Sequence, residues 1–254
     1  MIDKSYNKRA TKKHLRRYRR PFPGYVQLDI KYVPYKIDGK QYYEFNAVDH
    51  HSSFRVMELY KNRSIKSVLN FLDKVYDEMP FKIMQIQTDN AAEFTDKFSV
   101  CRGKEPSGKH DFDTWCTVRL IEHKLIPIGE KEINGKVENT HRFDDMEFYS
   151  QIDPQSFVEL KNLLAQHMAR WNLNRPTKTL GWLTPKQSIE KAYIKAIACV
   201  NYFVKKYAKP EMPRNCIYME DDKEIYFEKP KKPKKLTYVD RYIQYLDWLD
   251  KKAS

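Results

Sequence analysis

Three acidic side chains occupy positions where a carboxylate needs a cation or a hydrogen-bond donor beside it. Asp29 lies near the middle of YVQLDIKYV, an alternating segment in which a lone charge would be desolvated. Asp89 follows a short apolar run at residues 83–86, and ligands often bind just past the ends of such strands. Glu138 follows an Asn-Gly pair at the expected start of a helix. Three carboxylates suffice to hold two hard divalent ions, because Mg²⁺ keeps several of its waters.

The chemistry expected of such a site is displacement at phosphorus. Two ions held by carboxylates activate an attacking oxygen and stabilise the leaving oxygen. Positioning and charge stabilisation dominate these reactions, so cations close to the acids would hold substrate phosphates. Lys31, Lys136 and Arg142 are the candidates, because each lies within four residues of one of the acids. Arg142 also shares a helix face with Glu138 and His141.

Each acid also has a simpler interpretation. Asp29 could be a solvated strand residue or one half of a salt bridge. Asp89 could end its strand in a turn, because Asp-Asn is a common turn pair. Glu138 could be an acid favoured by the dipole of its helix. Asp49 and Glu93 are the nearest rival acids and rank below these three.

The segment around Asp29 begins a pattern of strands. Alternating apolar residues in YVQLDIKYV predict a strand with one buried and one polar face. Asp38-Gly39 predicts a tight hairpin turn, followed by strands at about residues 42–48 and 54–59. Short turns between three strands indicate an antiparallel meander.

Helical periodicity follows the meander. A helix is predicted from an N-cap at Ser64 to Pro80, then a short strand at 83–86, a polar loop at 101–113 and a strand at 119–126. Further helices are expected from Asn134-Gly135 to about residue 149, after Asp153-Pro154, and after Thr184-Pro185. This order of elements indicates an α/β or α+β sandwich with a mixed sheet.

The charge balance favours a polyanionic partner. Lys and Arg number 47 against 34 Asp and Glu, a net charge of +13, and nucleic acid is the commonest partner of such a chain. Residues 1–20 hold nine Lys/Arg and one acid, and residues 229–235 read KPKKPKK. Such blocks are typical of arms that neutralise phosphates, although they also serve as solubilising tails. We expect a basic arm at 1–21, a core at 22–195, and a small module or basic tail at 196–254.

Several protein classes are disfavoured. No apolar run approaches the roughly 20 residues of a membrane span, and the basic amino terminus lacks the apolar stretch of a signal peptide. The four cysteines form no CxxC pair and no cluster with zinc-ligand spacing, which predicts reduced thiols. We therefore expect a soluble intracellular protein with no membrane partner, cytoplasmic and nucleoid-associated in a bacterium or nuclear in a eukaryote.

Four segments, in order, resemble the integrase catalytic core of bacterial insertion-sequence transposases: VQLDIKYVP, QTDNAAEF, IPIGEKEINGKVENTHR and WNLNRPTKTLGWLTP. Retroviral integrases share this core, which is named DDE after its three acids. The resemblance spans about residues 22–195. Within the matching motifs, Asp29 takes the place of the first catalytic Asp, Asp89 that of the second, and Glu138 that of the Glu.

The resemblance implies a ribonuclease-H-like α/β fold, with a mixed five-stranded sheet flanked by helices, and two Mg²⁺ or Mn²⁺ ions at the acids. It implies cleavage of DNA at element ends and joining of a free 3′-hydroxyl to target DNA, by at least a dimer on the DNA. We assign Asn90 and Asn134, together with Lys31, Lys136 and Arg142, to DNA contacts.

The chain departs from the family pattern at several positions. Ala91 stands where relatives usually have Gly, and Asn139 and Thr140 replace an Arg and an aromatic residue. Close relatives begin with a helix-turn-helix region that reads the transposon end, whereas this chain starts at the equivalent of that region's basic trailing edge. A truncated or domesticated DNA-binding remnant is therefore the alternative. A ribonuclease H or junction nuclease fits the acids but not the NGKVE and WN…RP…LTP motifs.

Overall fold

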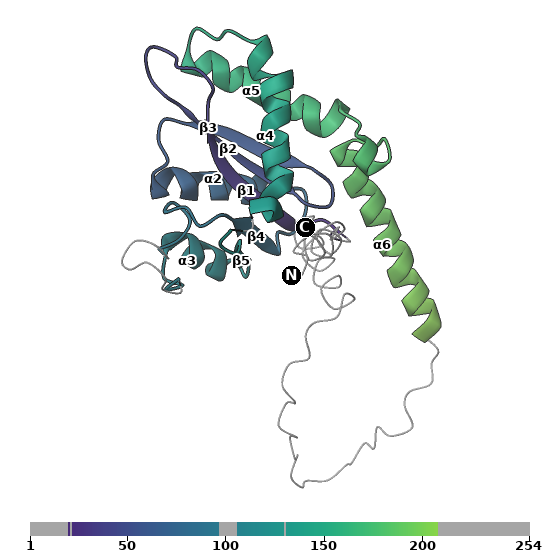
Figure 1. Cartoon of the computed structure of the whole chain (residues 1–254). Coiled ribbons are helices and arrows are strands. Elements are labelled where there is room, and N and C mark those ends of the chain that lie inside the picture. Colours follow the sequence, from purple (N-terminus) through teal and green to yellow (C-terminus); the bar gives the residue numbers. More distant parts are fainter. Residues whose placement is uncertain (1–19, 21, 97–105, 130, 208–254) are drawn as a thin grey trace, which may run out of the picture. The chain divides into compact units, whose positions relative to one another are not determined.

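Five strands form one mixed sheet in the computed structural model, which describes residues 20, 22–96, 106–129 and 131–207 (Figure 1). The antiparallel strands are β1 (Tyr25–Tyr32), β2 (Tyr43–Asp49) and β3 (Arg55–Tyr60). β4 (Gln85–Thr88) pairs parallel with both β1 and β5 (Glu122–Leu125), which gives the order β3-β2-β1-β4-β5. The predicted meander and the mixed five-stranded sheet are confirmed.

The hairpin between β1 and β2 closes where its turn residues predict. Asp38 and Gly39 have φ values of +50° and +70°. Ile37 and Lys40 exchange two backbone hydrogen bonds of 2.9 and 3.1 Å across this turn. Two left-handed residues in succession are the signature of the type I′ turn, whose twist matches that of the strands. The turn sets the register in which Asp29 pairs with Asn46.

Helices cover the sheet. α2 (Ile65–Glu78) packs on β3 and on α3 (Asp111–Val118), and α3 packs on β5. α4 (Gly135–Glu147) lies across β1 and β2, and α5 (Phe157–Asn174) packs on β3 (Figure 1). The polar side of β1 is therefore covered by a helix. This cover explains why α4 carries polar residues where a core helix would carry apolar ones.

The helix boundaries follow local capping chemistry. Ser64 caps α2 as predicted by accepting a hydrogen bond from the backbone N–H of Ser67, and Met79 ends the helix just before Pro80. The predicted start of α5 at Asp153-Pro154 is wrong. Ser156 caps this helix instead, because its hydroxyl accepts from the backbone N–H of Glu159.

Two further boundaries differ from the sequence prediction. The predicted polar loop at 101–113 is wrong at its end, where α3 already begins at Asp111 after an N-cap at His110. Residues 101–105 of this loop lie outside the described residues. The predicted strand at 119–126 is shorter, because Leu120 has a φ of +56° and closes a turn before β5. Left-handed backbone cannot continue a strand, so the pairing starts only at Glu122.

A buried ion pair joins the helices to the sheet. Arg55 of β3 donates to Asp144 of α4 at 2.6 Å, and the other Asp144 oxygen lies 2.9 Å from His167 of α5. The guanidinium of Arg55 also lies over the ring of Trp171, 4.5 Å from its centroid. Burial would raise the pKa of Asp144, but Arg55 and His167 outweigh this effect and lower the pKa to about 2.

The chain divides into two compact units, Met1–Ile189 and Glu190–Ser254. α6 (Pro185–Tyr207) begins where Thr184-Pro185 predicts, and the Thr184 hydroxyl accepts from the backbone N–H of Gln187 at 3.2 Å. No helix of the described residues is long and apolar enough to cross a membrane. The basic arm at 1–21, apart from Arg20, and the tail beyond residue 207 lie outside the described residues, and the division at residues 21 and 195 stays a prediction.

Candidate active site

Asp29 reaches the site from the middle of β1. The antiparallel partner of this residue on β2 is Asn46. One carboxylate oxygen of Asp29, Oδ2, lies 3.2 Å from Nε2 of His141 on α4. The sequence placed His141 on the helix face of Glu138 but not against Asp29. The pair forms because α4 packs directly over the polar side of β1.

Asp89 comes directly after β4, in a turn that its own side chain stabilises. Oδ1 of Asp89 accepts a 2.9 Å hydrogen bond from the backbone N–H of Ala91. The next residue, Asn90, donates from Nδ2 to the carbonyl of Ile126 at 2.8 Å. This bond ties the end of β4 to the segment that follows β5. Asp89 therefore does lie in a turn, as its simpler interpretation expected, and this turn presents the carboxylate at the end of β4.

Glu138 lies in the first turn of α4 and is exposed. Gln27 of β1 fixes this end of the helix, because its Oε1 accepts from the backbone N–H groups of Lys136 and Val137 at 3.2 Å each. Its Nε2 donates to the carbonyl of Ile133 at 2.8 Å. A strand side chain two positions before Asp29 thus positions the helix end that carries Glu138.

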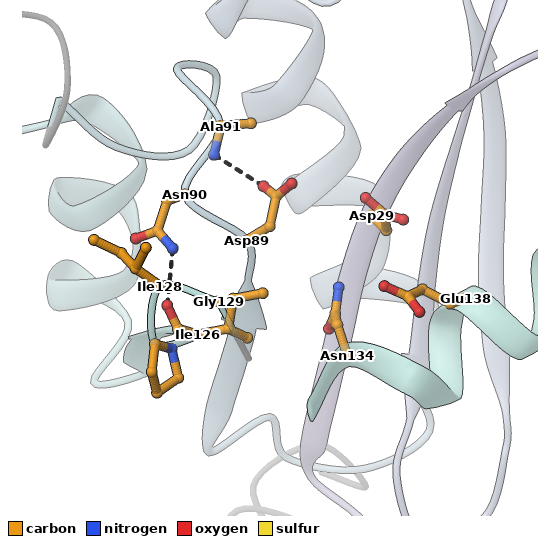
Figure 2. A pocket seen from close by; sticks show the side chains of 10 residues that line it. Asp29, Asp89, Asn90, Ala91, Ile126, Ile128, Gly129, Asn134 and Glu138 are labelled. Carbon is orange, nitrogen blue, oxygen red and sulfur yellow. Dashed lines mark hydrogen bonds between the residues drawn. The ribbon is translucent and has the colours of Figure 1, made fainter. Parts of the chain in front are cut away.

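The three acids line one pocket of about 400 Å³. Figure 2 shows their carboxylates around a common space, each presented by a different element. The remaining lining residues are Asn90, Ala91, Ile126, Pro127, Ile128, Gly129 and Asn134. The structure therefore brings together Asp29, Asp89 and Glu138. The first and last of these residues are 109 positions apart in the chain.

Two pocket amides have an oxygen with no partner in the described structure. Asn134 is only 2% exposed, and neither its Oδ1 nor the Oδ1 of Asn90 accepts a hydrogen bond from the described protein atoms. A buried carbonyl oxygen without a donor is unfavourable. The pocket wall therefore offers two amide oxygens, besides the three carboxylates, to a bound cation or hydrogen-bond donor. The sequence analysis assigned both asparagines to DNA contacts, and that assignment stays a prediction.

His141 sets the electrostatics beside Asp29. Its Nδ1 also lies 3.5 Å from Oε1 of Glu44, a residue of β2 with no exposed surface. Burial by itself would lower the pKa of His141, but its interactions with Asp29 and Glu44 outweigh burial and raise the pKa to about 9. At neutral pH the ring is a cation that holds both carboxylates. Sequence reasoning missed Glu44, whose alternating position in β2 was the available signal.

The candidate phosphate-binding cations differ in their surroundings. The Lys31 ammonium donates to Oδ1 of Asp145 at 2.6 Å and to the carbonyl of His141 at 3.2 Å, so it joins β1 to α4. Lys136 donates to the carbonyl of His50 at 2.6 Å. Arg142 is exposed on α4. The assignment of these cations to DNA stays a prediction.

The two rival acids have structural partners. Asp49 is fully buried and accepts hydrogen bonds from the backbone of Gly24 and from both the backbone and the hydroxyl of Ser52. Glu93 pairs with Arg63 at 3.1 Å. Neither rival lines the pocket. Their ranking below Asp29, Asp89 and Glu138 agrees with these positions.

A second group of potential metal ligands lies next to the pocket. Glu44, His141 and Asp144 bring one ligand atom each within 4.8 Å of one another. Protein cations already neutralise this group, because Arg55 pairs with Asp144 and the His141 ring is protonated. A divalent ion would add charge to a balanced cluster, so we assign the group a structural role.

The mixed sheet and its helices form a ribonuclease-H-like fold, and its pocket is lined by carboxylates from β1, from the end of β4 and from α4. Residues 22–131 match the family model of the integrase core domain. Asp29 and Asp89 lie inside the matched residues, and Glu138 lies seven positions beyond them. The assignment to bacterial insertion sequences in particular stays a prediction.

One curated relative is the protein named "Putative integrase ORF3" of Spiroplasma virus SpV1-C74. It is 28% identical over 182 residues, which cover 68% of this chain and 49% of the relative. The chain therefore spans about half the length of the curated relative that it matches. The activity and partners of a whole protein of this kind are accordingly proposals for this chain.

Solved structures share the fold at low identity. A chain of the simian T-cell lymphotropic virus intasome, in complex with a PP2A regulatory subunit, has a TM-score of 0.55 and 17% identity, covering 83% of this chain and 62% of that one. The HTLV-2 integrase catalytic core domain in complex with magnesium has a TM-score of 0.49 and 17% identity, covering 66% and 97%. The first of these supports the fold assignment alone, and the second adds nothing to it.

Proposed function

We propose that this chain is a metal-dependent DNA strand transferase of the transposase and integrase class. One observation carries the proposal: carboxylates from β1, from the end of β4 and from the first turn of α4 line a single pocket (Figure 2). The integrase core match supports the same chemistry. With the acids in place around one pocket, a DNA-binding remnant without catalysis is the less favoured alternative.

The donor set of the pocket suits hard divalent cations. Asp29, Asp89 and Glu138 offer only oxygen, and the two asparagine oxygens without donors are of the same kind. These three acids would hold two Mg²⁺ or Mn²⁺ ions, which when bound supply charge stabilisation to the attacking and leaving oxygens. His141 keeps one oxygen of Asp29 oriented, and Gln27 keeps the Glu138 end of α4 against β1.

The proposed reaction exchanges one phosphodiester for another. The 3′-oxygen of an element end forms a bond to a target phosphorus, and the bond from that phosphorus to the target 3′-oxygen breaks. The proton lost by the attacking hydroxyl is balanced by one gained by the released 3′-hydroxyl. The exchange needs no energy source, because one bond of the same type is made and one is broken. It can therefore be followed in reverse, on a branched DNA that represents the joined product.

The decisive experiment uses that reverse reaction, because it does not depend on a known terminal sequence. Labelled Y-shaped DNA is incubated with the full chain and Mg²⁺ or Mn²⁺. Asp29→Asn, Asp89→Asn and Glu138→Gln should each lower the rate by at least about 100-fold, since even outer-shell changes at metal sites cost 10–100-fold. Binding of the same DNA in chelator should persist in all three variants.

Glu93→Gln is the matched control. It removes an acid from the same post-β4 segment as Asp89, but one that pairs with Arg63 outside the pocket. Its rate should stay close to that of the unsubstituted chain. Full activity in any of the three pocket variants would refute the site, and activity in the presence of excess chelator would refute the metal requirement.

DNA is the proposed partner, as element end and as target, and two ends would be joined by at least a dimer. The proposed location follows from the partner: with the nucleoid in a bacterium, or in the nucleus of a eukaryote. Sedimentation of the chain with and without the branched DNA tests the assembly. A strictly monomeric complex that still joins DNA would contradict the dimer.

A further inference from the structure

An exposed tryptophan on strained backbone has no part in the proposed strand transfer. Trp182 is 69% exposed and has a φ of +63°. This left-handed region is unfavourable for a bulky side chain, because Cβ approaches the following carbonyl. Exposing a large apolar ring is a second cost. Strained residues of this kind cluster at sites where the strained side chain makes a functional contact.

The loop that holds Trp182 is tightly bonded. The Trp182 backbone N–H donates to the carbonyl of Thr177 at 2.9 Å, and that of Thr177 donates to Leu183 at 3.1 Å. The short helix η4 (Lys178–Leu180) lies between them and buries Leu180. The hydrogen bonds of the loop and the buried side chain of Leu180 therefore fix the backbone conformation that exposes the indole.

The loop is also anchored to the helix that carries Glu138. Nε of Arg175 donates to Oε2 of Glu147 at 2.9 Å, and the guanidinium stacks on Trp171 at 4.3 Å from the ring centroid. Glu147 and Glu138 lie nine residues apart on α4, which is about 13 Å along a helix. The loop and the proposed catalytic acid thus share one rigid support.

The surrounding sequence is cationic and free of acids. Residues 160–189 contain no Asp or Glu, whereas 34 acids in 254 residues would place about four in a stretch of this length. The stretch contains five cations: Lys161, Arg170, Arg175, Lys178 and Lys186. Lys178 and Lys186 stand four residues before and after Trp182, and both are exposed. Lys186 is in the first turn of α6, where the helix dipole disfavours a cation.

We propose that Trp182, Lys178 and Lys186 form a DNA contact in which the indole stacks on an unpaired or flared base. The two lysines would contact phosphates on either side of that base. Aromatic stacking with adjacent cations is the usual chemistry for holding single-stranded nucleic acid. The inference rests on the proposed function, in which DNA is the partner. A second copy of the chain is a poorer occupant, because two such loops would bring like charges together.

The first test measures DNA binding without turnover. The Asp29→Asn chain is titrated with a short fluorescent single strand and with the matching blunt duplex, in chelator and at several salt concentrations. Adding Trp182→Ala should weaken single-strand binding about 5- to 100-fold, and duplex binding less. Trp182→Phe should keep most of the affinity. Lys178→Gln and Lys186→Gln should each reduce the dependence on salt by about one phosphate contact.

The second test separates strain from binding with a matched position. Leu120 is also an exposed apolar residue with positive φ, at 84% exposure and +56°, but next to Arg119, which is paired with Asp73. Trp182→Gly and Leu120→Gly both relieve left-handed strain, so neither should lower the melting temperature. Only Trp182→Gly should weaken DNA binding.

Two results would overturn the proposal. One is unchanged single-strand affinity in both Trp182→Ala and Trp182→Gly. The other is reduced self-association in sedimentation with unchanged DNA affinity, which would assign the loop to a second copy. The branched-DNA reaction of the unsubstituted chain reports separately on strand transfer. Binding that depends on Trp182 in a chain without joining activity would therefore keep this contact while rejecting the catalytic proposal.

Discussion

His141 connects the proposed metal pocket to the charged residues behind it. One ring nitrogen faces Asp29 and the other faces Glu44, so a single imidazolium serves two carboxylates. Glu44 has two other close partners in the described residues: the Tyr149 hydroxyl, which donates to it at 2.6 Å, and the Lys31 ammonium, which lies 3.9 Å away. His141 is therefore the nearer of two cations that compensate the buried Glu44 carboxylate, with Lys31 the farther one, and the same ring orients Asp29.

Replacing His141 should affect stability as well as the site. His141→Ala leaves Glu44 buried with less compensation, and we expect a loss of about 1–3 kcal/mol in the free energy of unfolding. His141→Gln can still donate a hydrogen bond and should lose less. Urea unfolding of both variants measures the difference. Equal stability of the alanine variant and the unsubstituted chain would show that Glu44 does not need the ring.

At the scale of elements, Gly24 sets how closely β1 approaches the segment before β4. Its φ is +113°, and a Cβ at this position would meet the carbonyl oxygen of Lys82 at 2.7 Å. The carbonyl of Gly24 accepts from the backbone N–H groups of Met84 and Gln85. The parallel pairing of β1 with β4, which brings Asp29 and Asp89 to one pocket, thus begins beside a residue without a side chain.

Gly24→Ala should therefore destabilise the fold more than an ordinary turn substitution. Left-handed strain and the backbone clash together predict a loss of about 3 kcal/mol or more. Gly39→Ala is the control, because Gly39 has a φ of +70° but nothing within 4 Å of its Cβ position. It should cost about 1–2 kcal/mol. Similar unfolding midpoints for the two variants would contradict the clash.

At the scale of the whole domain, the Arg55–Asp144–His167 group joins three elements of the fold. Arg55 belongs to β3, Asp144 to α4 and His167 to α5, and all three side chains are buried. Removing one member of a buried charged group leaves the others uncompensated. The position of α4, and with it that of Glu138, therefore depends on the ionisation of Asp144.

This charge state predicts a defined acid sensitivity. The pKa of Asp144 is lowered to about 2 in the folded chain, so the unfolded chain takes up a proton first as the pH falls. The contribution of the ionised Asp144 carboxylate to the free energy of unfolding is complete above about pH 4, the ordinary range of an aspartate pKa. This contribution is lost as the pH falls toward 2. Asp144→Asn should be less stable at pH 7 and should show a shallower loss between pH 4 and 2. An unchanged slope in this variant would assign the acid sensitivity to other carboxylates.

Patterns among neighbouring residues determine much of the fold. The strand at β1, the Asp38-Gly39 turn and the Ser64 cap depend on short stretches of chain only, and each occurs where its pattern predicts. The alternating burial expected along β1 is not observed, because Tyr25–Leu28 are all buried and Tyr32 is exposed. The start of α5 shows the limit of such local patterns. Asp153-Pro154 and Ser156 are both plausible helix starts, and the choice depends on which hydroxyl or carboxylate can reach a free backbone N–H.

The three carboxylates were selected from the sequence by their context, whereas their gathering into one pocket is a property of the tertiary structure. Pairing of β1 with β4 and packing of α4 over β1 bring together residues that are distant along the chain. The partners of His141 were likewise decided by packing, because Asp29 and Glu44 are both far from this residue along the chain. Local sterics and hydrogen bonds let the sequence specify contacts between residues that are a few positions apart. Which buried charges meet is decided by how the helices pack on the sheet, since burial makes each unpaired charge costly.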